Sequence, residues 1–179
     1  MAIETFCNPD RNDCGRLADA ASGLLRQCDQ LVRGLPVGIY SAPSRILPGG
    51  TIGKHLRHVL DHYTAALAGL ATDSIVDYDR RERNVPMETD PGAGLASIAE
   101  LLGELRRVGR QSSATALTIR VMISAGGETE DLVTTLGREL AFATHHGVHH
   151  VAMMRGIASE HGVEIAPEIG KAPSTLNNE

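Results

Sequence analysis

Aromatic side chains are almost absent from this chain, and their scarcity restricts the kind of core that it can build. Its 179 residues include no Trp, three Tyr and two Phe. The core must therefore consist of Leu, Ile, Val, Ala and Met, which suits helices better than a β-sandwich, because strands favour aromatic and β-branched residues. One domain with a sizeable core suits this length, and two do not. We therefore expect a single all-α domain over residues 1–179.

Four stretches with apolar residues at helical spacing predict four long helices. The first three start at side chains that can cap a helix N-terminus, and in the third the cap is followed by a proline, which suits the first helical position. A glycine ends the first and the fourth. The expected helices cover residues 12–34, 51–70, 90–109 and 137–161.

The segments between these helices predict little further regular structure. Residues 72–89 are polar and charge-dense, which is typical of a long loop. Two partly alternating stretches, 117–123 and 131–135, flank the Gly126-Gly127 turn and predict a β-hairpin. The polar tail, residues 167–179, is expected to pack loosely over the other elements. The predicted fold is an up-down four-helix bundle with a small β-hairpin before the last helix.

The charge and cysteine content exclude several classes of protein. The net charge is −5 and Lys and Arg are spread along the chain, which argues against a nucleic-acid partner. Residues 1–12 lack the apolar run of a signal peptide, and no run approaches membrane-spanning length. The odd set Cys7, Cys14 and Cys28 contains no CxxC pair, so we expect reduced thiols in a cytoplasmic protein, with Cys28 facing the core.

Histidines carry the clearest functional signal. A single helical histidine is usually a surface group or a satisfied core residue, but two clusters on two separate predicted helices indicate a metal site. The eight residues are His55, His58 and His62 on the second expected helix and His145, His146, His149, His150 and His161 on the fourth.

Helical spacing narrows the candidate ligands on the fourth helix to a pair. His146 and His150 lie one turn apart on the flank of the apolar face, with Glu139 on the same line, whereas His145 and His149 point largely the other way. Two imidazoles at i and i+4 can reach one ion, with bonds of about 2.0–2.1 Å for zinc. His146 and His150 are therefore the better chelating pair.

On the second helix the spacing leaves the third ligand open. His55 and His62 are two turns apart, roughly 10 Å along the axis, and cannot both bind one ion. His58 lies between them and can act beside either neighbour. Spacing therefore allows any of the three histidines, with a mild preference for the central one.

Two short motifs resemble a known family. The segment Ile52-Gly53-Lys54-His55-Leu56-Arg57-His58 resembles the I-G-x-x-L-x-H segment of the DinB/YfiT-like metal-binding superfamily, and His146-Gly147-Val148-His149-His150 is similar to its H-x-x-H-H segment. The order and separation of the motifs and the four expected helices also fit. The resemblance implies a four-helix bundle whose metal ligands are His58, His146 and His150.

The sequence also departs from that family at one place. Many members have Gly and Gln after the last ligand, whereas this chain has Ala152 and Met153. This difference weakens the transfer of any particular activity.

A site with three histidine ligands predicts a catalytic metal. Three imidazoles leave one position of a tetrahedral ion open, and a bound ion can bring the pKa of water or a thiol near neutrality. The resemblance implies the thiol version, because relatives include transferases and isomerases that use bacillithiol or mycothiol. We expect a metal-dependent S-transferase or hydrolase acting on a small electrophile. The alternatives are a non-catalytic metal-binding or stress-response module, and a plain bundle without metal.

The sequence is compatible with more than one metal and more than one oligomeric state. Zinc, nickel, iron and manganese all accept imidazole, so the metal is not identified. Bundles of this size often pair through an exposed helix face, so a homodimer is compatible with the sequence.

Other side chains are candidates for supporting the site. His55, His62 and His149 are near the expected ligands, and Glu139 could orient an imidazole by accepting its free N–H, while Asp61 points away from the histidine flank. In the charged run 77–83, Arg80 and Arg81 could bind a carboxylate substrate if this loop folds over the site.

Overall fold

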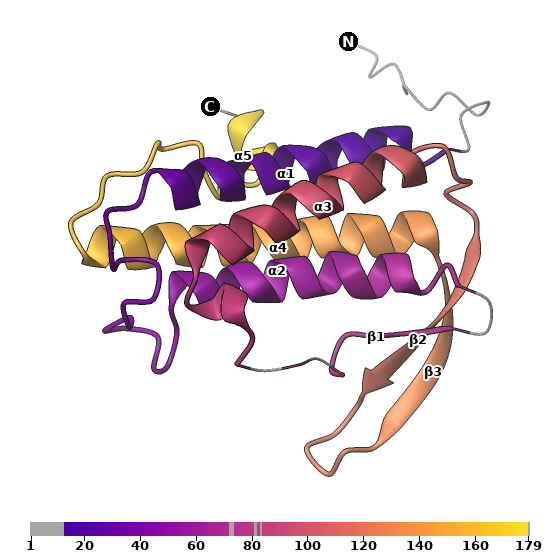
Figure 1. Cartoon of the computed structure of the whole chain (residues 1–179). Helices are drawn as coiled ribbons and strands as arrows, with labels where there is room; N and C mark the ends of the chain where they lie inside the picture. Colours follow the sequence, from indigo (N-terminus) through magenta and orange to yellow (C-terminus); the bar gives the residue numbers. More distant parts are fainter. Residues whose placement is uncertain (1–12, 72–73, 81, 83, 179) are drawn as a thin grey trace.

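Four long helices form the body of the molecule (Figure 1). The computed structural model describes residues 13–71, 74–80, 82 and 84–178. Each helix packs against two others, so that α1 and α2 lie on opposite sides of the core, as do α3 and α4. The four-helix bundle predicted from the sequence is therefore confirmed. The helices are α1 (Gly15–Arg33), α2 (Ile52–Ala68), α3 (Pro91–Val108) and α4 (Leu136–Glu160).

The order of directions differs from the up-down prediction, because α2 and α3 run parallel. At one end of the bundle the start of α1 lies beside the end of α3, where Gly15 adjoins Gly109. At the other end the starts of α2 and α3 adjoin, because a Cβ on Gly94 would lie 2.9 Å from Leu56. The connection between them accounts for this, because Val76 lies beside Gly69 at the end of α2 and Glu88 lies beside Gly53 at its start. The helices therefore run up, down, down, up.

The caps that define the helix starts are present. Thr51 accepts a hydrogen bond from the Lys54 amide at 3.1 Å, and Asp90 accepts one from the Gly92 amide at 2.8 Å, directly before Pro91. Each bond satisfies an amide of the first turn that has no partner within its helix. The predicted starts of the second and third helices are thereby confirmed.

The core is almost entirely aliphatic, as the composition predicts. Cys28 is fully buried within it, as expected, and burial raises the pKa of its thiol to about 12. No helix within the described ranges is both long and apolar enough to cross a membrane. The largest fully buried side chains are Tyr63, Leu25, Leu31, Ile52, Leu56, Leu60, Ile98, Leu105, Leu136, Leu140, Met154 and Ile157.

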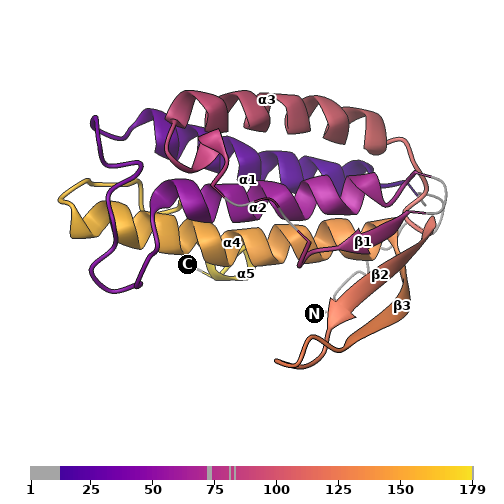
Figure 2. The same ribbon diagram turned by 60° about the horizontal axis from the view of Figure 1, so that its bottom comes forward.

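A small sheet extends from one end of the bundle (Figure 2). Strands β2 (Ala116–Met122) and β3 (Thr129–Thr135) form the predicted hairpin, pairing from Ala116 with Thr135 to Met122 with Thr129. The expectation of a loop over residues 72–89 was wrong in part, because β1 (Ile75–Asp77) pairs parallel to β2 and the short helix η1 (Pro86–Glu88) follows. A three-residue strand is too short to show an alternating pattern.

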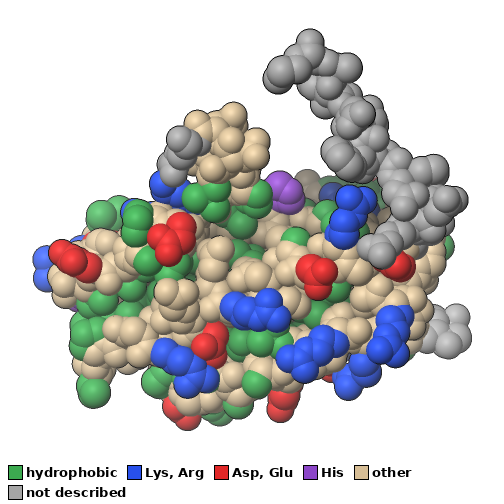
Figure 3. Space-filling model, turned by 90° about the horizontal axis from the view of Figure 1, so that it is seen from above, with side chains coloured by type: hydrophobic (Ala, Val, Ile, Leu, Met, Phe, Trp, Pro, Cys, Tyr) green, Lys and Arg blue, Asp and Glu red, His purple; other side chains and the backbone are tan. Residues whose placement is uncertain are grey.

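The C-terminal tail is attached more firmly than predicted. Ile169 is only 2% exposed, and the Arg155 guanidinium donates to the Pro167 carbonyl at 2.9 Å. The Gly170 amide donates to Gln27 of α1 at 3.2 Å, which brings the tail across to that helix. One buried apolar side chain and these hydrogen bonds hold the start of the tail more firmly than expected, whereas residues 173–178 are exposed. Figure 3 shows the tail on this face, where acidic and basic side chains are interspersed.

Candidate metal centre

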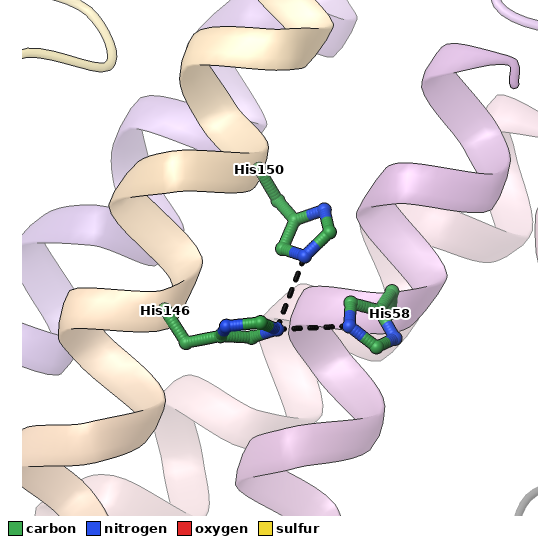
Figure 4. A group of neighbouring side chains, drawn as sticks. All are labelled: His58, His146 and His150. Carbon is green, nitrogen blue, oxygen red and sulfur yellow. Dashed lines mark hydrogen bonds between the residues drawn. The ribbon is translucent and has the colours of Figure 1, made fainter. Parts of the chain in front are cut away.

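Three histidine side chains converge between α2 and α4 (Figure 4). The Nε2 atom of His58 lies 2.9 Å from that of His146, which lies 3.1 Å from that of His150. His58 comes from α2, and the other two come from successive turns of α4. Of the histidines that spacing allowed on the second helix, the structure brings the central one to the pair on α4.

A glycine on α4 allows this helix to pack closely against its neighbours α1 and α2. A Cβ on Gly147, the residue after His146, would lie 2.4 Å from Leu24 of α1 and 3.4 Å from Val59 of α2. The first of these distances is a steric clash, so no larger residue fits at this position without displacement. Gly147 therefore lets the backbone of α4 pack closely against α1, and the same side of α4 contacts Val59 of the helix that carries His58.

The geometry of the three rings suits a shared cation better than hydrogen bonds alone. A neutral imidazole has one N–H and one lone pair, so the single Nε2 of His146 cannot bond well to two other Nε2 atoms at once. Three nitrogens bound to one tetrahedral zinc ion at about 2.0–2.1 Å would lie about 3.3 Å apart. Within the described part of the chain, this is the one cluster of three or more possible ligands whose atoms gather in this way.

Burial keeps His150 in the protonation state that a metal requires. Desolvation by burial, together with smaller effects from the neighbouring His146 and His55, lowers the pKa of this side chain to about 3. Burial also lowers the pKa of His55, with a smaller effect from His149. His150 is therefore neutral at physiological pH, with a lone pair available for a cation.

The other two histidines of α2 contact the cluster in different ways. The Nδ1 atom of His55 lies 3.0 Å from the Nδ1 atom of His150. His62 instead donates from Nδ1 to the backbone carbonyl of His58 at 2.8 Å, and its ring centre lies 4.4 Å from that of His146. Both predicted supporting residues on this helix therefore adjoin the cluster, and His149 of α4 lies next to His150 but is exposed.

Two aromatic side chains, which were not singled out in the sequence, cover the rings on the other side. Tyr78 stacks on His62 with ring centres 4.7 Å apart and an interplanar angle of 11°. Phe142 stacks on His146 at 5.6 Å and 17°. Neither residue belongs to a motif. Phe142 lies one turn before His146 on α4, so helical spacing is the one signal that could have identified it.

Glu139 holds Tyr78, which corrects the expectation that its carboxylate might orient an imidazole. This fully buried carboxylate accepts hydrogen bonds from the Tyr78 hydroxyl at 2.5 Å, the Thr134 hydroxyl at 2.6 Å and the Arg138 guanidinium at 2.9 Å. It therefore acts on the site indirectly, by placing the ring that stacks on His62. Asp61 faces Arg57 at 3.4 Å, in agreement with its predicted orientation away from the histidines.

A cavity of about 410 Å³ lies beyond Tyr78. Arg80 lines it, whereas Arg81 lies outside the described residues. An ion pair between Arg57 and Glu88, 2.5 Å long, ties the end of this loop to α2. The cavity lining comprises Asp61, Thr64, Ala65, Ala68, Ile75, Asp77, Tyr78, Arg80, Glu82, Val85 and Met87.

Comparisons with known proteins agree with this architecture. The structure is similar to that of YfiT from Bacillus subtilis, which is described as a probable metal-dependent hydrolase with an unusual four-helix bundle topology. The TM-score is 0.58, with 18% identity, 83% coverage of this chain and 87% of YfiT. At this identity the similarity shows the fold alone.

The sequence is similar to one further protein and to one family model. FK506-binding protein 5 of Rhizopus delemar is 28% identical over 118 residues, which make up 65% of this chain but only 31% of that protein. This chain thus spans about a third of that relative. The family model of the DinB superfamily matches residues 24–154, a region that contains all four long helices in whole or in part and the three converging histidines. The resemblance found in the motifs is confirmed, and the chain belongs to the DinB superfamily.

Proposed function

We propose that this protein is a metal-dependent enzyme that activates a small nucleophile for attack on an electrophilic substrate. In this proposal His58, His146 and His150 hold one divalent ion. The observation that carries it is the convergence of three Nε2 atoms on one point between α2 and α4. Zinc, nickel, iron and manganese are all compatible with such ligands.

The residues around the site support catalysis more than a purely structural role. Three protein ligands leave a coordination position open, and an ion held there would bring the pKa of a bound water or thiol near neutrality. The neutral state of His150 keeps its lone pair available. Tyr78 and Phe142 stack on the rings of His62 and His146 and so place aromatic surface beside the proposed metal.

The nucleophile is either water or a low-molecular-weight thiol. The description of YfiT as a probable metal-dependent hydrolase supports water. The resemblance of the motifs to thiol-dependent relatives supports a thiol. Both versions place the electrophile beside the open position of the metal, so the same three histidines serve either reaction.

The cavity beyond Tyr78 is the proposed place for the rest of the substrate. Its volume of about 410 Å³ is in the range of small-molecule sites. Ile75, Val85 and Met87 offer apolar contacts, and Arg80 offers a guanidinium for a carboxylate. We therefore propose a small electrophile with an acidic group.

A non-catalytic metal-binding module is the second candidate. The matched region makes up only 31% of the Rhizopus protein, so in that protein it is one part of a longer chain. Ala152 and Met153, which replace the Gly and Gln of many relatives, also favour this alternative. A module would bind the metal but turn over no substrate.

Metal analysis of untagged protein tests the proposal. We expect about one divalent ion per chain by mass spectrometry, and its loss in His146→Ala and His150→Ala. The exposed neighbour His149→Ala is the matched control and should keep the ion. Loaded protein is then assayed against ester and amide substrates and against electrophiles with added thiols. A wild-type protein that binds no zinc, nickel, iron or manganese overturns the proposal, and bound metal without turnover favours the module.

A further inference from the structure

Both ring nitrogens of His150 have a histidine partner. Its Nε2 faces the Nε2 of His146, and its Nδ1 lies 3.0 Å from the Nδ1 of His55. The rings of His55 and His150 are 5.3 Å apart at an angle of 35°. His55 stands on α2 one turn before His58, so α2 contacts the pair on α4 at two points.

The position of the protons follows from the chemistry of imidazole. If the Nε2 lone pair of a neutral His150 is directed at a cation, its one proton must lie on Nδ1. That N–H can donate to His55 only if the Nδ1 of His55 carries a lone pair. The proton of His55 must then lie on its own Nε2. With a cation bound at the Nε2 of His150, a single arrangement of protons therefore satisfies the contact.

The surroundings of His55 restrict it to this contact. Its Nε2 is buried and has no hydrogen-bond partner among the described residues. Gly50, at the end of the loop 43–50, lies against this atom, because a Cβ on Gly50 would lie 3.2 Å from it. Glu160 at the end of α4 fixes that loop by accepting hydrogen bonds from the Ser44 hydroxyl at 2.8 Å and the Arg45 amide at 2.6 Å. The ring of His55 is thereby packed with its Nδ1 toward His150.

We propose that His55 is a positioning residue whose Nδ1 accepts a hydrogen bond from His150 and so aims the Nε2 of His150 at the metal. This inference rests on the proposed metal site. His55 is not itself a ligand, because the nitrogen that faces the cluster is bonded to a ligand instead. Carboxylates and backbone carbonyls usually supply such acceptors, and their loss typically weakens metal binding 10–100-fold. Here an imidazole performs this task.

Three substitutions separate the hydrogen bond from packing. His55→Leu fills similar space without an acceptor. His55→Asn places an amide oxygen at the δ position, where His55 has its accepting nitrogen, whereas His55→Gln moves that oxygen one atom further. His149→Leu is the control, because His149 is also next to His150 but is exposed. Zinc affinity is measured by competition with a chromophoric chelator, and the ligand field by the visible spectrum of the cobalt-loaded protein.

The expected losses of zinc affinity follow an order that a packing role alone does not produce. His55→Leu and His55→Gln should weaken zinc binding by about 10–100-fold and shift the cobalt bands. His55→Asn should lose much less, and His149→Leu should match the wild type. The melting temperature of the metal-free proteins is measured beside these values, and we expect it to follow a different order.

Other results would overturn the inference. Wild-type affinity and cobalt bands in His55→Leu would show that the contact does not position the ligand. Equal losses in all three His55 variants, in parallel with their melting temperatures, would show a packing role only. If the wild type itself binds no metal, the proposed function fails first, and this inference fails with it.

Discussion

Two histidines on α2, His55 and His62, lie on opposite sides of His58 and meet the candidate metal centre in opposite ways. His55 meets His150 nitrogen to nitrogen at 3.0 Å, under a loop that is fixed to the end of α4. His62 turns its nitrogen to the backbone of its own helix and presents ring faces, with Tyr78 stacked on it. The first side is built to orient a ligand, and the second side forms a wall next to a cavity.

This difference assigns metal binding to the side of His55 and substrate binding to the side of Tyr78. Changes near His55 should act on metal affinity, whereas changes near Tyr78 should act on the substrate side and leave metal affinity largely intact. Both sides depend on the close approach of α2 and α4. Substitutions that disturb both sides, one side or only the cavity therefore test whether the division is real.

Gly147→Val should have the largest effect because it disturbs both sides. A Cβ at this position would lie 2.4 Å from Leu24, so this buried side chain or α4 itself must shift. We expect a loss of about 3 kcal/mol in the free energy of unfolding, measured in denaturant, together with a large loss of zinc affinity. Gly156→Ala on the same helix is the control, since nothing lies within 4 Å of its added Cβ, and it should not destabilise the protein. Unchanged stability in Gly147→Val would refute this account of helix packing.

The sequence predicted the parts of the site that depend on helical periodicity. One-turn spacing selected His146 and His150 as a pair, and the structure brings both to His58. Spacing alone could not choose among the histidines of α2, because that choice depends on how far α2 and α4 are shifted along each other. Nor could it tell which nitrogen of His55 faces the cluster, since this depends on the packing of the loop 43–50.

Parts of the structure that depend on distant segments escaped prediction. The strand β1 is three residues long and exists through its pairing with β2. The parallel course of α2 and α3 depends on where the segment 69–90 packs, which no local pattern encodes. Glu139 could be placed on the ligand line of α4, but its partner Tyr78 is 61 residues away in the sequence.

Glu139→Leu should disturb only the side of Tyr78. The substitution leaves the hydroxyls of Tyr78 and Thr134 without their acceptor in a buried place. We expect a loss of about 2 kcal/mol in the free energy of unfolding, with zinc affinity close to that of the wild type. Glu139→Gln keeps one acceptor oxygen and should lose less. A tenfold or greater loss of zinc affinity in Glu139→Leu, with stability unchanged, would show instead that this carboxylate acts on the ligands.

Arg80→Ala should have the smallest effect, confined to the cavity. Arg80 lines the cavity and is not one of the three converging histidines, so neither metal content nor the melting temperature should change. If its guanidinium binds an acidic group of the substrate, KM should rise by about tenfold for substrates with a carboxylate, since a charge-assisted hydrogen bond contributes about 1.5–3 kcal/mol. The matching substrate without the carboxylate should show no difference between Arg80→Ala and the wild type. Equal changes for both substrates would mean that Arg80 shapes the cavity rather than recognising charge, and unchanged turnover of both would remove Arg80 from substrate binding altogether.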